Sequence, residues 1–325
     1  MEKNKKRKWV VIGLLIIILT VLLGGAIFAR DMISKKPAAQ TSETSLSDGV
    51  NWLNAHYDLT LKKRQDQALT QSLIDTFHLK KDDLSPGWSV YGETLDGEKI
   101  VAFRETTRMR SASTIKPFIV AAAYQYCLYP REGTHPSSLS ETGKNDLHDL
   151  SQKAVSESDN EAANALILLI GEGDKTKGFD RINSWCREQG FSQTTVGRLF
   201  LETQPEGDNY TSAADCVKLL TGLYQKKIVN AQTSSELLAF LTAQSDRGKI
   251  PRYIDGKGAV IANKTGELNA DYGMGFVDAD IALVYHDKGG FALAVLMGDE
   301  QNHFDETNET ISRMAKTVFD AWMSK

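Results

Sequence analysis

Predicted strands on both sides of a long helical stretch constrain the fold of this chain more than any other feature. The five predicted strands are 88–95, 99–104, 258–262, 280–285 and 291–297. The first two meet at Asp96-Gly97, a typical hairpin turn, and helical patterns cover 51–78, most of 114–241, and 306–322. Because early and late strands must meet to bury their apolar faces, we expect an α+β fold with one antiparallel five-stranded sheet and an inserted all-helical lobe.

The first 49 residues predict attachment to a membrane. Residues 1–8 form a basic tail, residues 9–29 carry no charged side chain, and residues 30–49 have the polar composition of a flexible tether. As a helix, the uncharged stretch would extend about 31 Å, the thickness of a bilayer core. We therefore expect a single-pass anchor in the cell membrane, a cytoplasmic N-terminus and an extracytoplasmic domain at 50–325. A cleaved signal peptide is the alternative, although residues 26–29 are a poor cleavage sequence.

Composition excludes several classes of function. The chain has 325 residues, 41% hydrophobic and 25% charged, as in an ordinary globular protein. Its net charge is −4 and its only basic cluster is N-terminal, so we expect no nucleic acid partner. Cys127, Cys186 and Cys216 lack the spacing of metal ligands, and we expect no metal and no cofactor. We expect the three cysteines to be buried apolar side chains, with a Cys186–Cys216 disulfide as the alternative.

One S-x-x-K motif occurs in the sequence, Ser113-Thr-Ile-Lys116, directly before an apolar helical run. Residues at i and i+3 share a helix face, so Lys116 would direct its amine at the Ser113 hydroxyl. A nucleophilic serine needs such a base, and a lysine can serve when burial lowers its pKa. The free N–H groups of a helix start suit an oxyanion hole. Alone, however, a tetrapeptide of this kind is expected by chance in a chain of this length.

Two further motifs follow in the chain. Ser158-Asp159-Asn160 opens a helical run, and alone it would be interpreted as a helix cap. Lys264-Thr265-Gly266 ends the predicted strand at 258–262, and alone it would be an exposed strand end. Together, S-x-x-K, S-D-N and K-T-G in this order are the signature of penicillin-binding proteins and class A β-lactamases. Each falls in the expected element: a helix start, a loop into a helix, and an inner strand.

Residues 50–325 therefore resemble the class A β-lactamase-like, penicillin-binding-type serine hydrolases, and the resemblance covers nearly the whole domain. Supporting segments are 108–112, 160–164, 209–215 and 241–251. The resemblance implies an α/β/α sandwich of the β-lactamase/DD-peptidase type. It also implies that Ser113 is the nucleophile and Lys116 its base, that Ser158 relays a proton to the leaving group, and that Asn160 holds the amide of the acyl side chain.

The same resemblance assigns the third motif to the leaving side of the substrate. Lys264 would place positive charge near the acid group of the substrate, and Thr265 would donate a hydrogen bond to that group. Gly266 continues this substrate-binding strand. The backbone N–H of Glu267 would form the oxyanion hole with that of Ser113.

Glu202 is the candidate deacylation base. Class A β-lactamases carry a glutamate, followed four residues later by an asparagine, on a loop before the stretch that corresponds to 209–212. That glutamate aims a water molecule at the acyl-enzyme. Here Glu202 lies near the right place, but Glu206 stands where asparagine is typical and the loop is short. A surface carboxylate is the alternative, and we expect inefficient deacylation of a β-lactam adduct.

Glu267 departs from the family pattern because small residues are typical directly after K-T-G. Positions 265 and 267 share a strand face, so this carboxylate would lie beside the pocket for the carboxylate of the substrate. At about 5 Å, two like charges repel by roughly 3 kcal/mol at an effective dielectric constant near 20. We therefore expect a substrate whose leaving side is neutral or cationic, such as an amidated or cross-linked peptide.

The sequence thus predicts an extracytoplasmic serine hydrolase or acyltransferase that forms a covalent acyl-enzyme at Ser113 on an amide or ester. We expect a small-molecule or peptidoglycan-peptide substrate, a membrane contact through the N-terminal helix, and a monomer. Two alternatives are a working class A β-lactamase that uses Glu202, and an inert membrane-tethered module for wall binding or sensing.

Overall fold

The structure is a computed structural model that describes residues 66–79, 87–130, 141–202, 206–270, 275–301 and 303–324. All of them fall in the unit Thr60–Lys325. The predicted tail, anchor and tether at 1–49 lie outside the described residues, as does the first part of the helix predicted at 51–78. Within the described ranges, no helix combines the length and the apolar character that a bilayer crossing requires.

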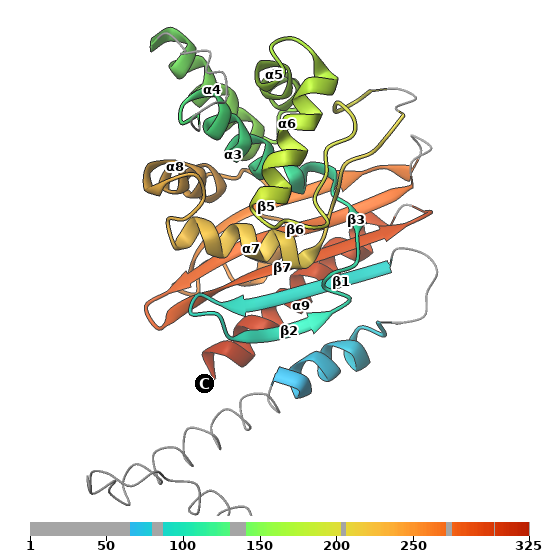
Figure 1. Cartoon of the computed structure of the whole chain (residues 1–325). Helices are drawn as coiled ribbons and strands as arrows, with labels where there is room; N and C mark the ends of the chain where they lie inside the picture. Colours follow the sequence, from blue (N-terminus) through green and yellow to red (C-terminus); the bar gives the residue numbers. More distant parts are fainter. Residues whose placement is uncertain are drawn as a thin grey trace, which may run out of the picture. The chain divides into compact units, whose positions relative to one another are not determined.

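A five-stranded antiparallel sheet, ordered β2-β1-β7-β6-β5, forms the centre of the fold (Figure 1). Its strands are β1 (Gly87–Thr94), β2 (Lys99–Phe103), β5 (Val260–Leu268), β6 (Phe276–His286) and β7 (Gly289–Asp299). Val90 of β1 pairs with Val295 of β7, which confirms that early and late strands form one sheet. The prediction of an inner strand for the third motif was wrong, because β5 lies at an edge of the sheet and extends through Lys264-Thr265-Gly266.

The helices and short elements complete the predicted α+β architecture. Residues 66–76 are helical. The named elements are β3 (Met109–Arg110), η1 (Ala112–Ile115), α3 (Lys116–Cys127), α4 (Glu141–Ser156), α5 (Asn160–Ile170), α6 (Lys175–Glu188), β4 (Tyr210–Thr211), α7 (Ala213–Tyr224), α8 (Ala231–Thr242), η2 (Ile250–Tyr253) and α9 (Phe304–Met323). The helices α3 to α8 thus lie in the chain between β2 and β5, as the predicted insertion of a helical lobe requires.

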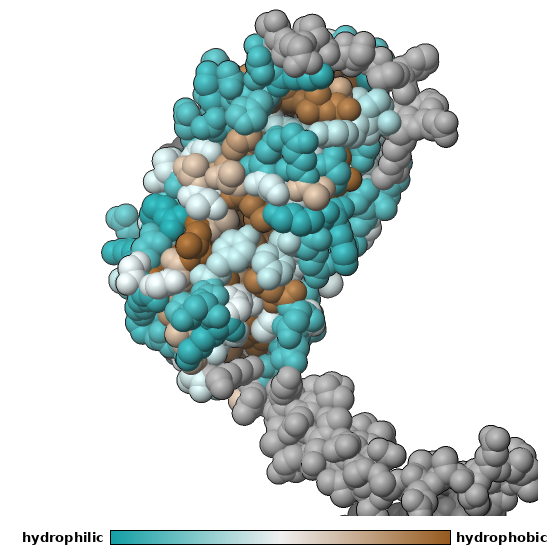
Figure 2. All heavy atoms as spheres, turned by 90° about the vertical axis from the view of Figure 1, so that its left-hand side faces the viewer, coloured by the Kyte–Doolittle hydropathy of each residue, from teal (hydrophilic) through white to brown (hydrophobic). Residues whose placement is uncertain are grey.

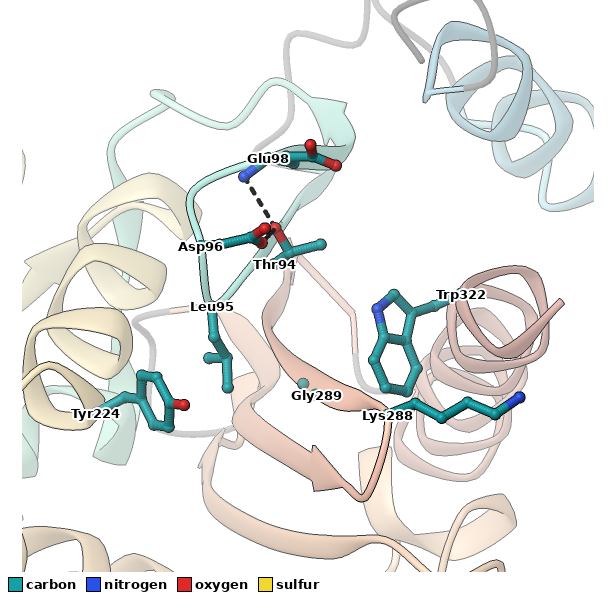
Figure 3. Close-up of a pocket in the computed structure, with 9 residues that line it drawn as sticks. Thr94, Leu95, Asp96, Glu98, Tyr224, Lys288, Gly289 and Trp322 are labelled. Atoms are coloured by element: carbon teal, nitrogen blue, oxygen red, sulfur yellow. Dashed lines mark hydrogen bonds between the residues drawn. The ribbon is translucent and has the colours of Figure 1, made fainter. Parts of the chain in front are cut away.

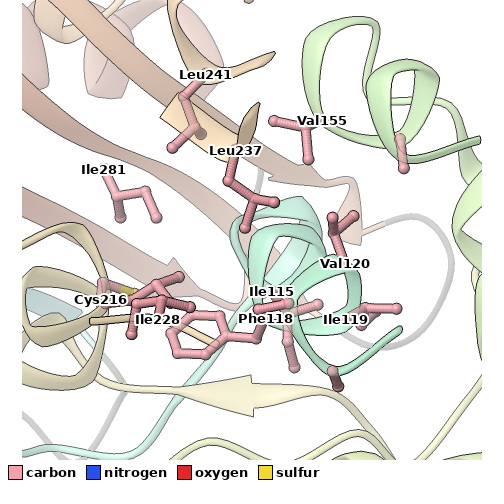
Figure 4. Close-up of a cluster of buried hydrophobic side chains, with 14 of the residues drawn as sticks. Ile115, Phe118, Ile119, Val120, Val155, Cys216, Ile228, Leu237, Leu241 and Ile281 are labelled. Atoms are coloured by element: carbon pink, nitrogen blue, oxygen red, sulfur yellow. The ribbon is translucent and has the colours of Figure 1, made fainter. Parts of the chain in front are cut away.

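Successive side chains of the central strands point to opposite faces of the sheet, and both faces are buried. Ile281 and Leu283 of β6 belong to the core shared with the helical lobe, whereas Ala282 and Val284 belong to the core shared with α9. In the lobe, α3 is apolar on every side and is buried along most of its length, with Phe118 and Val120 beside Leu237 of α8 (Figure 4). The helix that follows the S-x-x-K serine is therefore the core helix of the lobe.

The first described helix and the three cysteines also contribute buried apolar side chains. Leu73 is 1% exposed and packs in the α9 core, with Leu69 and Phe77 partly buried beside it. Cys127, Cys186 and Cys216 are all buried and free, so the structure places no Cys186–Cys216 disulfide. The face of the molecule in Figure 2 presents mainly hydrophilic side chains, with apolar ones in separate small areas.

Candidate active site

Ser113 lies on η1, a single tight turn that joins β3 to the buried helix α3. Thr114 stabilises this turn, because both its hydroxyl (2.7 Å) and its N–H (3.1 Å) donate to the carbonyl of Ser111. Ala112 has a φ of +44°, a left-handed conformation that is costly for a residue with a side chain. Strain of this kind persists only where the surroundings impose it, and here it sets the position of the next residue, Ser113.

The edge strand β5 approaches η1 closely at Gly266. A Cβ atom at this position would lie 2.9 Å from Thr114 Cγ2 and 3.0 Å from the carbonyl oxygen of Ser111. Glycine is therefore required by the close approach of the two backbones. In the described sheet β5 has a strand neighbour on one side only, and the oxyanion hole predicted from the N–H groups of Ser113 and Glu267 would form where this edge strand meets η1.

The ammonium of Lys116 connects the first motif to the second. Its Nζ donates to the Ser158 carbonyl (2.6 Å) and to Asn160 Oδ1 (2.8 Å), and lies 3.4 Å from Ser158 Oγ. The predicted contact with the Ser113 hydroxyl is replaced by these three, because Ser113 lies on a 3₁₀ turn and Lys116 begins the α-helix. Within the described residues, the Ser113 hydroxyl makes no hydrogen bond and is available to attack a substrate.

Ser158 lies between two lysines. Lys264 Nζ donates to Ser158 Oγ at 2.9 Å and to the carbonyl of Thr265 at 2.7 Å, so the third motif meets the second across the edge of the sheet. Ser158 has a φ of +58°, at the junction where α4 ends and Asp159 caps α5. This second strained residue aims its hydroxyl at both ammonium groups. The structure thus brings together Lys116, Ser158, Asn160 and Lys264.

Lys116 and Lys264 are both buried, and the charge of Lys116 affects the pKa of Lys264. Burial lowers the pKa of Lys116 to about 7, against the opposing effect of Asp159. Burial, with a smaller contribution from the positive charge of Lys116, lowers the pKa of Lys264 to about 7. At neutral pH each amine is therefore neutral for a large part of the time, and a neutral amine can accept a proton from a serine hydroxyl.

Residues 132–322 match the model of the β-lactamase enzyme family, more than half of the chain. The chain belongs to this family. The match contains the second and third motifs and begins after Ser113 and Lys116. No curated protein sequence gives a significant match.

Solved structures of similar fold agree with the β-lactamase-family assignment. A class A β-lactamase from Bacteroides cellulosilyticus DSM 14838 superposes with a TM-score of 0.64 at 18% identity, over 80% of this chain and 99% of that one. A β-lactamase from Sphaerobacter thermophilus DSM 20745 gives 0.59 at 20% identity, over 79% and 97%. The protein PBP-A gives 0.60 at 22% identity, over 81% and 97%. These similarities establish the fold, and with the family match they make this chain a serine hydrolase of the β-lactamase/penicillin-binding superfamily.

In this β-lactamase-family protein, the loop between α6 and β4 places a phenylalanine beside Lys116. The ring of Phe200 lies 4.6 Å from Lys116 Nζ, and only 8% of its surface is exposed. Asn164 of α5 fixes this position by accepting from the Phe200 N–H (2.8 Å) and donating to its carbonyl (3.1 Å). Sequence reasoning missed both residues, because a phenylalanine on a loop carries no chemical signal of its own.

Glu202, the predicted deacylation base, is bound to other groups of the same region. One carboxylate oxygen accepts from Lys175 Nζ of α6, and the other accepts from the Leu199 N–H at 3.0 Å. The hydrogen bond from Lys175 holds the pKa of Glu202 below its usual range. A carboxylate with a lowered pKa and two partners is a weak general base, and these contacts favour the alternative of a structural loop carboxylate.

Glu267 is also paired, in a cluster that sequence reasoning missed. Its Oε1 lies 2.8 Å from Nζ of the buried Lys249, which is also 2.6 Å from Oδ1 of the buried Asp278. Thr307 of α9 donates to the other oxygen of Asp278. The sequence indicates such a cluster only through Asp278 and Asp280, two acidic residues in a strand whose other side chains are mostly apolar.

A cavity of about 380 Å³ lies elsewhere, at the turn between β6 and β7. Tyr224, Lys288 and Trp322 border it (Figure 3). Thr265 pairs with Asp280 near the start of β6, whereas the cavity lies beyond the end of that strand, so it is separate from the Ser113 site. Within the described ranges, no three histidine, cysteine or acidic side chains gather closely enough to hold a metal ion.

Proposed function

We propose that this protein is an acyl-transfer enzyme of the cell wall, which forms an acyl-enzyme at Ser113 on a peptide substrate and hydrolyses β-lactams poorly. The observation that carries this proposal is the ring of Phe200 over Lys116, together with the binding of Glu202 by Lys175. The three intact motifs, gathered at the edge of the sheet, support covalent catalysis and argue against an inert binding module.

The acylation step follows from the roles that the family resemblance gives to Ser113 and Lys116, and from the contacts of Ser158 with both lysines. Ser113 Oγ bonds to the carbonyl carbon of the substrate while its hydroxyl proton passes to the neutral amine of Lys116. Ser158, hydrogen-bonded to Lys264 and close to Lys116, delivers a proton to the leaving nitrogen as the C–N bond breaks. The leaving amine then departs from the Ser158 side. Ser158 regains its proton from Lys116. Water or an acceptor amine then enters by the same route and bonds to the acyl carbon as the bond from that carbon to Ser113 Oγ breaks, and the proton given up by the water or amine restores the Ser113 hydroxyl.

A β-lactam adduct differs because its leaving nitrogen stays attached to the acyl group. The Ser158 side remains occupied, and water has to approach from the loop that carries Phe200. On that side the apolar ring of Phe200 lies beside Lys116, and the nearby carboxylate of Glu202 is held by Lys175 and Leu199. We therefore expect a β-lactam adduct to persist while a peptide adduct turns over.

The location of the enzyme rests on the sequence. Residues 9–29, without a charged side chain and preceded by a basic tail, support a single membrane anchor with the domain on the outer side of the membrane. That location would place the site beside cell-wall peptide.

Intact-mass measurement on the full chain tests the function. Wild type and Ser113→Ala are incubated with a muropeptide digest, with a neutral N-benzoylglycyl thioester of thioglycolamide, and with a saturating concentration of benzylpenicillin. We expect thiol release and a penicillin adduct of one-to-one stoichiometry in wild type, and neither in Ser113→Ala. The penicillin adduct should remain after removal of free drug.

Two results would contradict the proposal in different ways. The absence of any Ser113-dependent adduct or turnover would favour an inert module. Repeated hydrolysis of nitrocefin, with rapid loss of the penicillin adduct, would make the protein a working β-lactamase.

A further inference from the structure

A charged cluster stands on the face of β5 that lies opposite Lys264. Lys249 is 1% exposed and Asp278 is fully buried, whereas 48% of the Glu267 side chain is exposed. Glu267 and Asp278 are cross-strand partners in β5 and β6, and Lys249 enters from the segment before η2 to contact both. One ammonium thus faces two carboxylates, and the cluster has a net charge of −1.

The lysine of this cluster is unavailable to a substrate. Burial alone lowers the pKa of Lys249, but the carboxylates of Asp278 and Glu267 hold it above its ordinary value, so the lysine stays charged. Its Nζ also lies 3.4 Å from the carbonyl of Ala279, which it contacts as a third partner. With three partners and no exposed surface, Lys249 cannot also bind a substrate carboxylate.

Glu267 is the member of the cluster that a substrate would meet. It lies two residues beyond Thr265 on the same face of the edge strand, roughly 7 Å along the chain direction. The neighbouring Gly266 packs against the turn that carries Ser113, so this part of β5 borders the place where the leaving group lies. The exposed charge at this border is negative, and the nearest compensating charge is buried behind it.

We propose that Glu267, held in place by Lys249 and Asp278, selects substrates whose leaving group is cationic and rejects those whose leaving group ends in a carboxylate. This inference rests on the proposed function, because it concerns the leaving side of the same acyl transfer. The substrate class is then a peptide joined through an amine-bearing residue, as in a cross-link, and a peptide with a free C-terminal carboxylate is excluded.

Three thioesters with one acyl group and different leaving groups test this selection. N-benzoylglycyl thioesters of thioglycolate, thioglycolamide and thiocholine release thiols of charge −1, 0 and +1, and thiol release is followed by absorbance with a disulfide reagent. In wild type we expect kcat/KM to be highest for the thiocholine ester and lowest for the thioglycolate ester. In Glu267→Gln, the ratio of the anionic to the cationic ester should rise by on the order of tenfold.

Glu172→Gln is the matched control. Glu172 is a glutamate with 46% of its side chain exposed and is ion-paired with Lys177, but it lies at the turn between α5 and α6, outside the catalytic motifs. This variant should leave the ratio of the two esters at the wild-type value. Asp278→Asn provides a second variant, since it removes one negative charge behind Glu267 and should shift the ratio in the same direction by a smaller factor.

The outcomes separate the inference from the function on which it rests. If no ester reacts in a Ser113-dependent way, the proposed function fails. If all three react but the ratio is the same in wild type and Glu267→Gln, or changes equally in Glu172→Gln, the enzyme stands and the charge selection is wrong.

Discussion

The ring of Phe200 covers the amine of Lys116, with Nζ 4.6 Å from the ring centre. Asn164 holds both backbone groups of Phe200, so this contact is part of the fold and not the result of one side-chain rotamer. An apolar ring in this position lies against the amine whose pKa burial lowers to about 7 and which the proposed function uses as the base.

Replacement of Phe200 by glutamate should introduce hydrolysis of the penicillin adduct. A carboxylate at this position would lie beside Lys116 and could activate a water molecule, and a positioned general base contributes about 100-fold or more to a rate. The half-life of the benzylpenicillin adduct, measured by intact mass after removal of free drug, should fall accordingly in Phe200→Glu.

Phe200→Leu and Glu202→Gln are the controls for this prediction. Leucine opens space without supplying a base, so the adduct should persist. Glu202→Gln should leave the adduct lifetime close to that of wild type, because Glu202 is already bound by Lys175. A lifetime shortened as much by leucine as by glutamate would show that access of water, and not a missing base, limits hydrolysis.

Acylation should accelerate as the pH rises through about 7. In the proposed function the neutral amine of Lys116 accepts the proton of Ser113, and burial lowers the pKa of Lys116 to about 7, so the reactive form increases across this range. The measurement is the rate of thiol release from the neutral thioester against pH. Lys116→Arg should be almost inactive, since a guanidinium stays protonated. A rate that does not change between about pH 6 and 8 would contradict the role of a neutral lysine.

Lys264 should make the stability of the protein depend on pH. Its pKa is about 7 in the folded protein and about 10.4 in an unfolded chain, so the folded state binds fewer protons between these values. The free energy of unfolding therefore gains up to ~1.4 kcal/mol per pH unit from this group as the pH rises from 7 towards 10. Urea unfolding at several pH values should show a smaller gain in Lys264→Met than in wild type, because Lys116, whose pKa is also lowered to about 7, still contributes in the variant. Parallel curves for the two proteins would rule out the lowered pKa.

Gly266→Ala should damage both the fold and the rate. The added methyl group would lie 3.0 Å from the Ser111 carbonyl and 3.1 Å from the Thr114 N–H nitrogen, both backbone atoms that cannot turn aside. We expect a loss of about 1–3 kcal/mol in the free energy of unfolding. We also expect a lower acylation rate at temperatures where the variant is folded, because β5 and η1 would move apart. A variant of unchanged stability would mean that the turn yields easily.

The motifs predicted the composition of the site but not all of its geometry. The resemblance carried by S-x-x-K, S-D-N and K-T-G implied one site containing Lys116, Ser158, Asn160 and Lys264, and the structure brings these four residues together. The spacing within S-x-x-K predicted a contact from Lys116 to Ser113, whereas the amine binds Ser158 and Asn160, since a 3₁₀ turn and an α-helix differ in their rotation per residue.

Two features depended on contacts between residues distant in the chain. Glu267 was expected to lie beside the substrate pocket, but its cluster with Lys249 and Asp278 was not predicted, because no local pattern indicates that a lysine before η2 turns inward. The hairpin at Asp96-Gly97 and the alternation of the strands were predicted correctly, because they follow from local turn chemistry and burial. The edge position of β5 was missed, since strand order is a property of the whole sheet.

The pairing of β1 with β7 also determines when the enzyme can begin to work during its synthesis. The hairpin of β1 and β2 is made early, and a two-stranded hairpin alone is marginally stable in water. Until β7 is made, the edge of β1 is open to pairing with other chains, which makes the unfinished protein prone to aggregation. The helical lobe can become compact in this interval, but Ser113 gains its neighbour strand β5 only when the C-terminal part of the chain arrives. We therefore expect a nascent chain to lack activity until its synthesis is nearly complete.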